Sequence, residues 1–136
     1  MRTERLDAGR REDLARAGEL LRAGEVVAVP TETVYGLAAD ARNPSAVERI
    51  FVAKGRPRSH PLIVHIASLD QLERLAVRVP ARAYQLAEHW WPGPLTLLLE
   101  KHDGVPGEMT GSLPTIAVRM PDHPVMCTDR IARCRH

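Results

Sequence analysis

The stretch from Glu25 to Leu37, with the sequence EVVAVPTETVYGL, constrains the fold more than any other part of the chain. Its valine-rich start is typical of a buried strand. Pro30 is expected to end that strand, because proline has no backbone N–H to donate to a ladder. Gly36 supplies the backbone freedom that a turn needs. Threonine, glutamate and tyrosine side chains lie between them, and α/β proteins bind ligands at strand ends, so we expect this turn to line a ligand site.

The composition is that of one domain. The chain has 136 residues, of which 44% are hydrophobic and 26% charged, and only 4% are aromatic, so the core must be aliphatic. The net charge of +2 arises within residues 125–136, which hold three arginines and one aspartate. Because the rest of the chain is neutral overall, its total charge does not indicate a nucleic-acid partner.

Targeting and membrane signals are absent from the sequence. The first residues carry charges and no apolar signal region, and no apolar run reaches the length of a membrane span. Cysteine is confined to Cys127 and Cys134 near the end, which fits a reducing compartment. A disulfide or metal site at these two residues stays an alternative. We therefore expect a cytoplasmic protein with no membrane partner.

Hydrophobic periodicity predicts one α/β domain. Helices are expected over 11–23, from Asn43-Pro44 to the glycine at 55, and over 81–91. A capping box at 68–71 predicts a further short helix that begins there. Strands are expected over 25–29, 62–66, 95–99 and 115–119. The strand 95–99 is apolar on both faces, which predicts a central place in the sheet.

A basic segment, KGRPR at residues 54–58, follows the predicted helix after Pro44. Lysine and arginine side chains at a flexible glycine suit phosphate oxygens, although a solvated basic loop would have the same composition. Lys54 lies seven residues after Val47, so it is expected on the buried face of the helix. No Walker loop and no G-x-G-x-x-G occurs, so phosphates would have to be held by side chains.

Two polar residues lie on strand faces that are otherwise apolar. His65 alternates with Ile63 and is either a hydrogen-bonded core histidine or a ligand-binding residue. Arg119 shares a face with Thr115, and a buried guanidinium there needs a partner, for which a carboxylate is expected. Thr115 and Arg119 would lie about 13 Å apart along the strand. That separation suits a ligand with two ends, such as a nucleotide joined to a carboxylate-bearing group.

Taken together, these residues resemble the YrdC-like family of threonylcarbamoyl-AMP synthases over about residues 11–124. The matching segments are PTETVYGL (30–37), KGRP (54–57), PLIVH (61–65), WPGPLT (91–96) and TIAVRMP (115–121) followed by His123-Pro124. The resemblance implies an open, twisted, mixed α/β sheet with flanking helices around a basic cavity. It also implies that L-threonine, bicarbonate and ATP form L-threonylcarbamoyl-adenylate and pyrophosphate, with ATP as a substrate and Mg²⁺ assisting.

The resemblance assigns roles to particular residues. By position, three would bind L-threonine: Thr33, His65 and Arg119. Four would bind ATP: Lys54, Arg56, His60 and Thr115. Of these, Lys54 and Arg56 would be catalytic, by neutralising charge on the phosphates, while His60 stands where asparagine is common. Glu32 and Asp40 could assist a metal ion, but the spacing singles out no metal ligands. A tRNA-modifying transferase complex would be the partner that moves the threonylcarbamoyl group to adenosine in tRNA.

The final residues depart from the family pattern. We expect a YrdC-like domain over 1–124, and an atypical tail over 125–136 that reads as truncated or frameshifted, because an apolar helix and a serine-x-asparagine segment do not follow. The sheet would then be incomplete at the C-terminus. The chain alone would bind ATP weakly, expose apolar edge surface, and be inactive or poorly stable. Three alternatives remain: a module that binds double-stranded RNA or tRNA without making the adenylate, a fragment of a carbamoyltransferase that uses carbamoyl phosphate in hydrogenase maturation, and an inactive truncated fragment.

Overall fold

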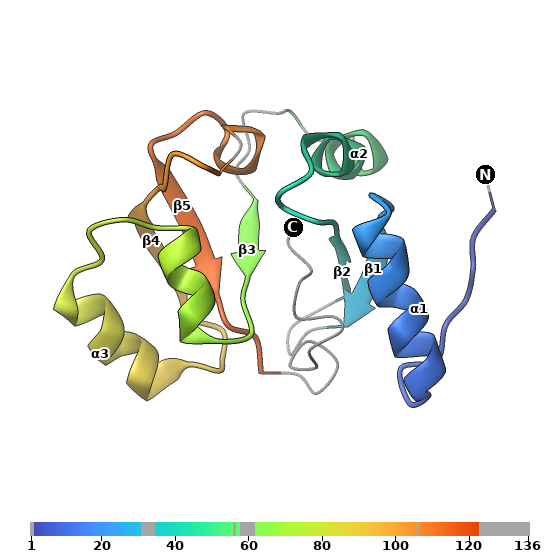
Figure 1. Cartoon of the computed structure of the whole chain (residues 1–136), viewed down its shortest axis with the longest axis horizontal. Helices are drawn as coiled ribbons and strands as arrows, with labels where there is room; N and C mark the ends of the chain where they lie inside the picture. Colours follow the sequence, from blue (N-terminus) through green and yellow to red (C-terminus); the bar gives the residue numbers. More distant parts are fainter. Residues whose placement is uncertain (1, 31–34, 56, 58–61, 106, 123–136) are drawn as a thin grey trace.

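The computed structural model describes residues 2–30, 35–55, 57, 62–105 and 107–122. It has a mixed α/β fold with two small sheets, each covered by helices (Figure 1). One sheet pairs β1 with β2, and the other has the strand order β3-β5-β4. The predicted α/β class is confirmed. None of the helices in the described ranges is both long and apolar enough to span a membrane.

The valine-rich run forms β1 (Val27–Pro30), which pairs antiparallel with β2 (Tyr35–Ala38). The predicted strand end is confirmed: Pro30 is the last residue of β1 and pairs with Tyr35, a strand-end place that proline tolerates. The turn expected at Gly36 was wrong. Gly36 pairs with Val29 inside β2 and is not among the glycines with positive φ, because residues 35–38 form a strand.

Helix α1 (Arg11–Arg22) confirms the first predicted helix. Its residues Ala17 and Leu21 are buried against Val29 and Ala38 of the β1–β2 sheet, which makes a small core of its own. The helix is followed by Gly24 at φ 88°, the left-handed conformation that glycine adopts most readily after a helix.

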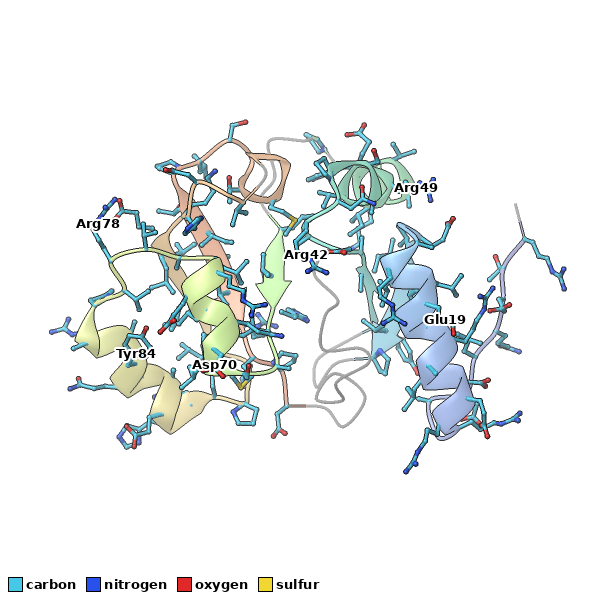
Figure 2. The ribbon with its side chains drawn as sticks, viewed as in Figure 1. Glu19, Arg42, Arg49, Asp70, Arg78 and Tyr84 are labelled. Carbon is cyan, nitrogen blue, oxygen red and sulfur yellow. The ribbon has the colours of Figure 1, made fainter. Side chains whose placement is uncertain are left out.

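Helix α2 (Pro44–Lys54) has the predicted ends. The side chain of Asn43 accepts hydrogen bonds from the backbone N–H groups of Ser45 and Ala46, and Gly55 ends the helix at φ 63°. The side chains of Ala46, Val47, Ile50 and Phe51 are buried and belong to the main hydrophobic core. Arg49 of the same helix, labelled in Figure 2, donates to the Gly24 carbonyl and to the Glu25 carboxylate, so α2 is joined to the segment between α1 and β1.

The burial predicted for Lys54 was wrong: this residue is exposed. Lys54 is the last residue of α2, at the end where the helix extends past the core. The long lysine side chain can therefore keep its ammonium group in water.

The larger sheet holds β3 (Ile63–His65), β4 (Thr96–Glu100) and β5 (Thr115–Arg119). Strand β5 is central, parallel to β3 and antiparallel to β4. The central place predicted for residues 95–99 was therefore wrong within the described residues, where β4 pairs with β5 alone apart from an isolated bridge between Ala76 and Lys101. Only one apolar face of β4 is covered, and Leu98 on the other face is 72% exposed.

The two faces of this sheet differ in chemistry. One face is apolar and lies under three short helices, η1 (Leu69–Arg74), α3 (Ala81–Trp90) and η2 (Gly107–Thr110) (Figure 1). Its buried strand residues are Val64, Leu97, Leu99, Ile116 and Val118. The capping box predicted at 68–71 is not formed by Ser68, whose side chain makes no cap hydrogen bond. The side chain of Gln71 accepts a hydrogen bond from the backbone N–H of Ala67. The opposite face carries the polar residues described next.

Candidate functional site

Three polar residues lie in one row across the larger sheet. His65 of β3 is in register with Arg119 of β5, and Arg119 is in register with Thr96 of β4. Residues in register on paired strands point to the same face, so the three side chains form a polar row. His65 is 3% exposed, and Thr96 and Arg119 are half-buried. Two residues that the resemblance assigned to threonine binding are therefore neighbours in the structure.

The partner of Arg119 differs from the prediction. Its Nε and Nη2 atoms both donate to the Oγ1 hydroxyl of Thr96, over 3.0 and 2.9 Å. A hydroxyl satisfies the guanidinium where a carboxylate was expected. In the sequence Thr96 is only the last residue of the segment WPGPLT, and no residue near Arg119 in the sequence indicates that Thr96 is its hydrogen-bond partner.

Backbone hydrogen bonds fix the end of β5 on both sides. The N–H of Ile66 donates to the Arg119 carbonyl over 2.9 Å, and the N–H of Gly93 donates to the Met120 carbonyl over 2.8 Å. Arg119 therefore projects from a backbone that is held from β3 and from the loop between α3 and β4.

The loop between α3 and β4 is itself held in place by Trp91. The Trp91 side chain is buried, and its Nε1 donates to the Leu95 carbonyl over 2.8 Å. This hydrogen bond lies one residue before Thr96. The neighbouring Trp90, by contrast, is 62% exposed.

Of the residues assigned to ATP, the structure describes Lys54 and Thr115. Thr115 is the first residue of β5 and is exposed, whereas Arg119 is the last. Lys54 ends α2, and both α2 and β5 contact η2 (Figure 1). The described phosphate-side candidates thus belong to elements that meet at η2, and the threonine-side candidates lie at the far end of β5.

An acidic residue faces the start of β5. Glu100 is in register with Thr115, and its carboxylate accepts hydrogen bonds from Arg78, which Figure 2 labels at the outer side of the molecule. The hydrogen bond from Arg78 lowers the pKa of Glu100 below its usual value. Arg78 therefore offsets a negative charge beside a position that the resemblance assigns to phosphate binding.

Several predicted site residues fall outside the described ranges. Thr33, Arg56 and His60 are in this group, as are Glu32 and the cysteines Cys127 and Cys134. Their assigned roles stay predictions. Asp40, the other acidic residue considered for a metal, accepts hydrogen bonds from Arg42. Across the described residues no group of three or more His, Cys, Asp or Glu side chains is placed to hold a metal ion.

Two hollows on the described part of the molecule can be compared with the predicted cavity. One, of about 650 Å³, lies between α1 and the β1–β2 sheet and reaches Pro30 and Tyr35, which flank the segment that contains Thr33. The other, of about 350 Å³, lies beside Arg78 and Glu100. Neither is lined by the polar row, so the basic cavity implied by the resemblance stays a prediction.

Comparison with known proteins gives a consistent result. A family model for Sua5, YciO and YrdC proteins, described as "Telomere recombination", matches residues 19–128. A threonylcarbamoyl-AMP synthase of Pyrococcus abyssi is 59% identical over 100 residues, which is 74% of this chain and 29% of the relative. A threonylcarbamoyl-AMP synthase of Bacillus subtilis is 54% identical over 113 residues, 82% of this chain and 33% of the relative.

A solved structure agrees with the sequence matches. The crystal structure of P. abyssi Sua5 complexed with L-threonine superposes with a TM-score of 0.89 at 48% identity, over 97% of this chain and 38% of that one. The chain spans about a third of the length of the curated relatives named above.

Proposed function

The chain belongs to the Sua5, YciO and YrdC family, and from this premise we propose that it forms L-threonylcarbamoyl-adenylate from L-threonine, bicarbonate and ATP, with release of pyrophosphate. The product would supply a transferase complex that modifies adenosine in tRNA. The names of the P. abyssi and B. subtilis relatives support this proposal, as does the L-threonine bound to P. abyssi Sua5. Residues 1–124 would supply the YrdC-like domain, in the cytoplasm.

The observation that carries the proposal is the polar row of His65, Arg119 and Thr96. In this row a half-buried cation lies beside a buried histidine, on the face of the sheet opposite its apolar face. We propose that Arg119 binds the carboxylate of L-threonine, because a guanidinium can donate two parallel hydrogen bonds to it. His65 and Thr33 would bind the rest of the amino acid.

The phosphates of ATP would lie toward η2. Lys54 and Thr115 belong to elements that meet there, and Arg56 and His60 follow Lys54 closely in the sequence. The length of β5, about 13 Å from Thr115 to Arg119, suits a ligand with a phosphate group near one end and an amino acid at the other. We propose that Mg²⁺ arrives bound to ATP, since it is commonly held through substrate phosphates.

The chemistry would depend mainly on position and charge. The amine of L-threonine captures carbon dioxide with loss of a proton, or bicarbonate with loss of water, to give a carbamate. A carbamate oxygen then attacks the α-phosphorus of ATP. The bond from the α-phosphorus to the bridging oxygen breaks, and pyrophosphate leaves with its electron pair. Lys54 and Arg56 would stabilise the negative charge that gathers on the phosphate oxygens.

Two measurements on the purified chain test the proposal. Isothermal titration should detect binding of L-threonine that is lost in Arg119→Ala and retained in Arg82→Ala, a change at an exposed residue of α3. A pyrophosphate assay with ATP and bicarbonate should show release that depends on L-threonine. Absence of binding would contradict the threonine site, and binding without pyrophosphate release would contradict the synthase activity of this chain.

The alternatives give different results in the same assays. A carbamoyltransferase fragment would consume carbamoyl phosphate in place of bicarbonate. A module that binds double-stranded RNA or tRNA would bind the nucleic acid with no effect of L-threonine.

A further inference from the structure

We infer that Thr96 is a positioning residue that turns the guanidinium of Arg119 so that its Nη1–Nη2 edge faces the substrate carboxylate. The inference rests on the proposed function and assigns a role to a residue outside the predicted site. It starts from the two hydrogen bonds that Nε and Nη2 of Arg119 donate to one hydroxyl oxygen, Thr96 Oγ1.

The choice of edge follows from the shape of a guanidinium. The group carries five N–H donors in one plane, and it can present either the Nε–Nη2 edge or the Nη1–Nη2 edge to a carboxylate. Thr96 takes the donors of the first edge. Among the described residues no other hydrogen bond is recorded for the Arg119 side chain, so the second edge is left for a ligand.

Thr96 is well placed to hold this orientation. It lies directly opposite Arg119 in the antiparallel pair of β4 and β5, and its β-branched side chain has few rotamers on a strand. Arg119 has its backbone fixed from the other side by the N–H of Ile66. Both side chains are half-buried, which reduces competition from water for the shared hydrogen bonds.

The neutrality of the hydroxyl explains why a threonine suits this position. A carboxylate partner would also orient the guanidinium, but it would offset the positive charge and compete with the substrate carboxylate for the same donors. The hydroxyl fixes the direction of Arg119 and leaves its full charge for the ligand. A neutral partner is therefore the one expected where the arginine must bind an anion.

The test compares Thr96→Val, which keeps the branched shape and removes the acceptor, with Thr96→Ser, which keeps the hydroxyl. Isothermal titration is carried out with L-threonine and with L-threoninamide, which lacks the carboxylate. Thr96→Val should bind L-threonine about tenfold more weakly than the wild type, and Thr96→Ser should bind it as the wild type does. Binding of L-threoninamide should be equal in all three proteins. Equal loss for both ligands, or no loss for L-threonine, would overturn the inference, and thermal unfolding checks that the variants fold.

A second measurement separates this inference from the proposed function. In ¹⁵N–¹H spectra of the ligand-free chain, the Nε–H signal of Arg119, assigned by its loss in Arg119→Lys, should exchange slowly with water in wild type and Thr96→Ser and fast in Thr96→Val. If the wild type binds no L-threonine, the proposed function fails while this signal still decides whether Thr96 holds the guanidinium. Fast exchange of that signal in the wild type would overturn the positioning role.

Discussion

Gly93 donates its backbone N–H to the carbonyl oxygen of Met120 over 2.8 Å, which joins the loop after α3 to the end of β5. A Cβ at position 93 would lie 2.5 Å from the carbonyl oxygen of Trp90, so backbone atoms would have to move. We expect Gly93→Ala to lower the free energy of unfolding by about 1–3 kcal/mol, as overpacking commonly does. Urea denaturation measures this change, and L-threonine binding should weaken because the end of β5 shifts.

Gly107→Ala is the matched control. A Cβ at position 107 would meet no heavy atom within 4 Å, so its free energy of unfolding should change by less than about 1 kcal/mol. Equal effects of the two substitutions would show that the contact with Trp90 does not determine the cost.

The cap of α2 should contribute measurably to stability. Asn43 Oδ1 accepts from the N–H groups of Ser45 and Ala46, over 3.1 and 3.3 Å. Asn43→Ala should lower the free energy of unfolding by about 1 kcal/mol in urea titrations, because two donors at the helix start lose their partner. Ser68→Ala serves as its control, since Ser68 precedes η1 without a side-chain cap and should show almost no change. A stability loss at Ser68 as large as that at Asn43 would contradict this account.

Lys54 should affect ATP and not stability. Its side chain is exposed at the end of α2, so Lys54→Ala removes a cation without opening the core. We expect at least tenfold weaker ATP binding by titration and loss of pyrophosphate release, with an unchanged melting temperature. Arg22→Ala removes another exposed cation from the last turn of a helix, α1, and should leave ATP binding intact. Normal pyrophosphate release in Lys54→Ala would exclude this residue from the phosphate site.

The ion pair of Glu100 with Arg78 should make the free energy of unfolding depend on pH in the acidic range. Hydrogen bonds from Arg78 lower the pKa of Glu100 below its usual value of about 4.5, so the carboxylate binds protons less readily in the folded chain than in the unfolded chain. The stabilisation is thus present above about pH 4.5 and is lost as the pH falls through the lower folded pKa.

Melting curves of wild type and Glu100→Gln between pH 7 and pH 3 check this. The difference between them should be small, because the pair is exposed, and should disappear at the acid end and in high salt. A difference that grows toward low pH would contradict the assigned cause.

Local signals in the sequence predicted the helices well, and the pairing of strands less well. Asn43, Pro44 and Gly55 define the ends of α2 through contacts within a few residues, which a sequence displays directly. The place of β4 at the edge of the described sheet depends on which distant strand pairs with which, and its apolar pattern alone suggested the opposite.

The site shows the same limit. The alternation of residues 115–119 predicted that Arg119 shares a face of β5 with Thr115, and the alternating burial along the strand confirms this. Its hydrogen-bond partner, Thr96, lies 23 residues earlier on another strand, so the register of β4 had to be known before the partner could be identified. The exposure of Lys54 likewise depends on where the core ends, which periodicity does not reveal.

The parallel pairing of β3 with β5 links ligand affinity to folding. His65 and Arg119 become neighbours only when two segments far apart in the chain are paired, so the unfolded chain cannot form the threonine site that we propose. A ligand that binds only the folded state raises the free energy of unfolding by RT ln(1 + [L]/Kd), about 2.7 kcal/mol at one hundred times Kd. L-threonine should therefore stabilise the folded chain. Substitutions far from the polar row that destabilise the pairing of β3 with β5 should weaken the apparent affinity for L-threonine, because they lower the fraction of folded molecules.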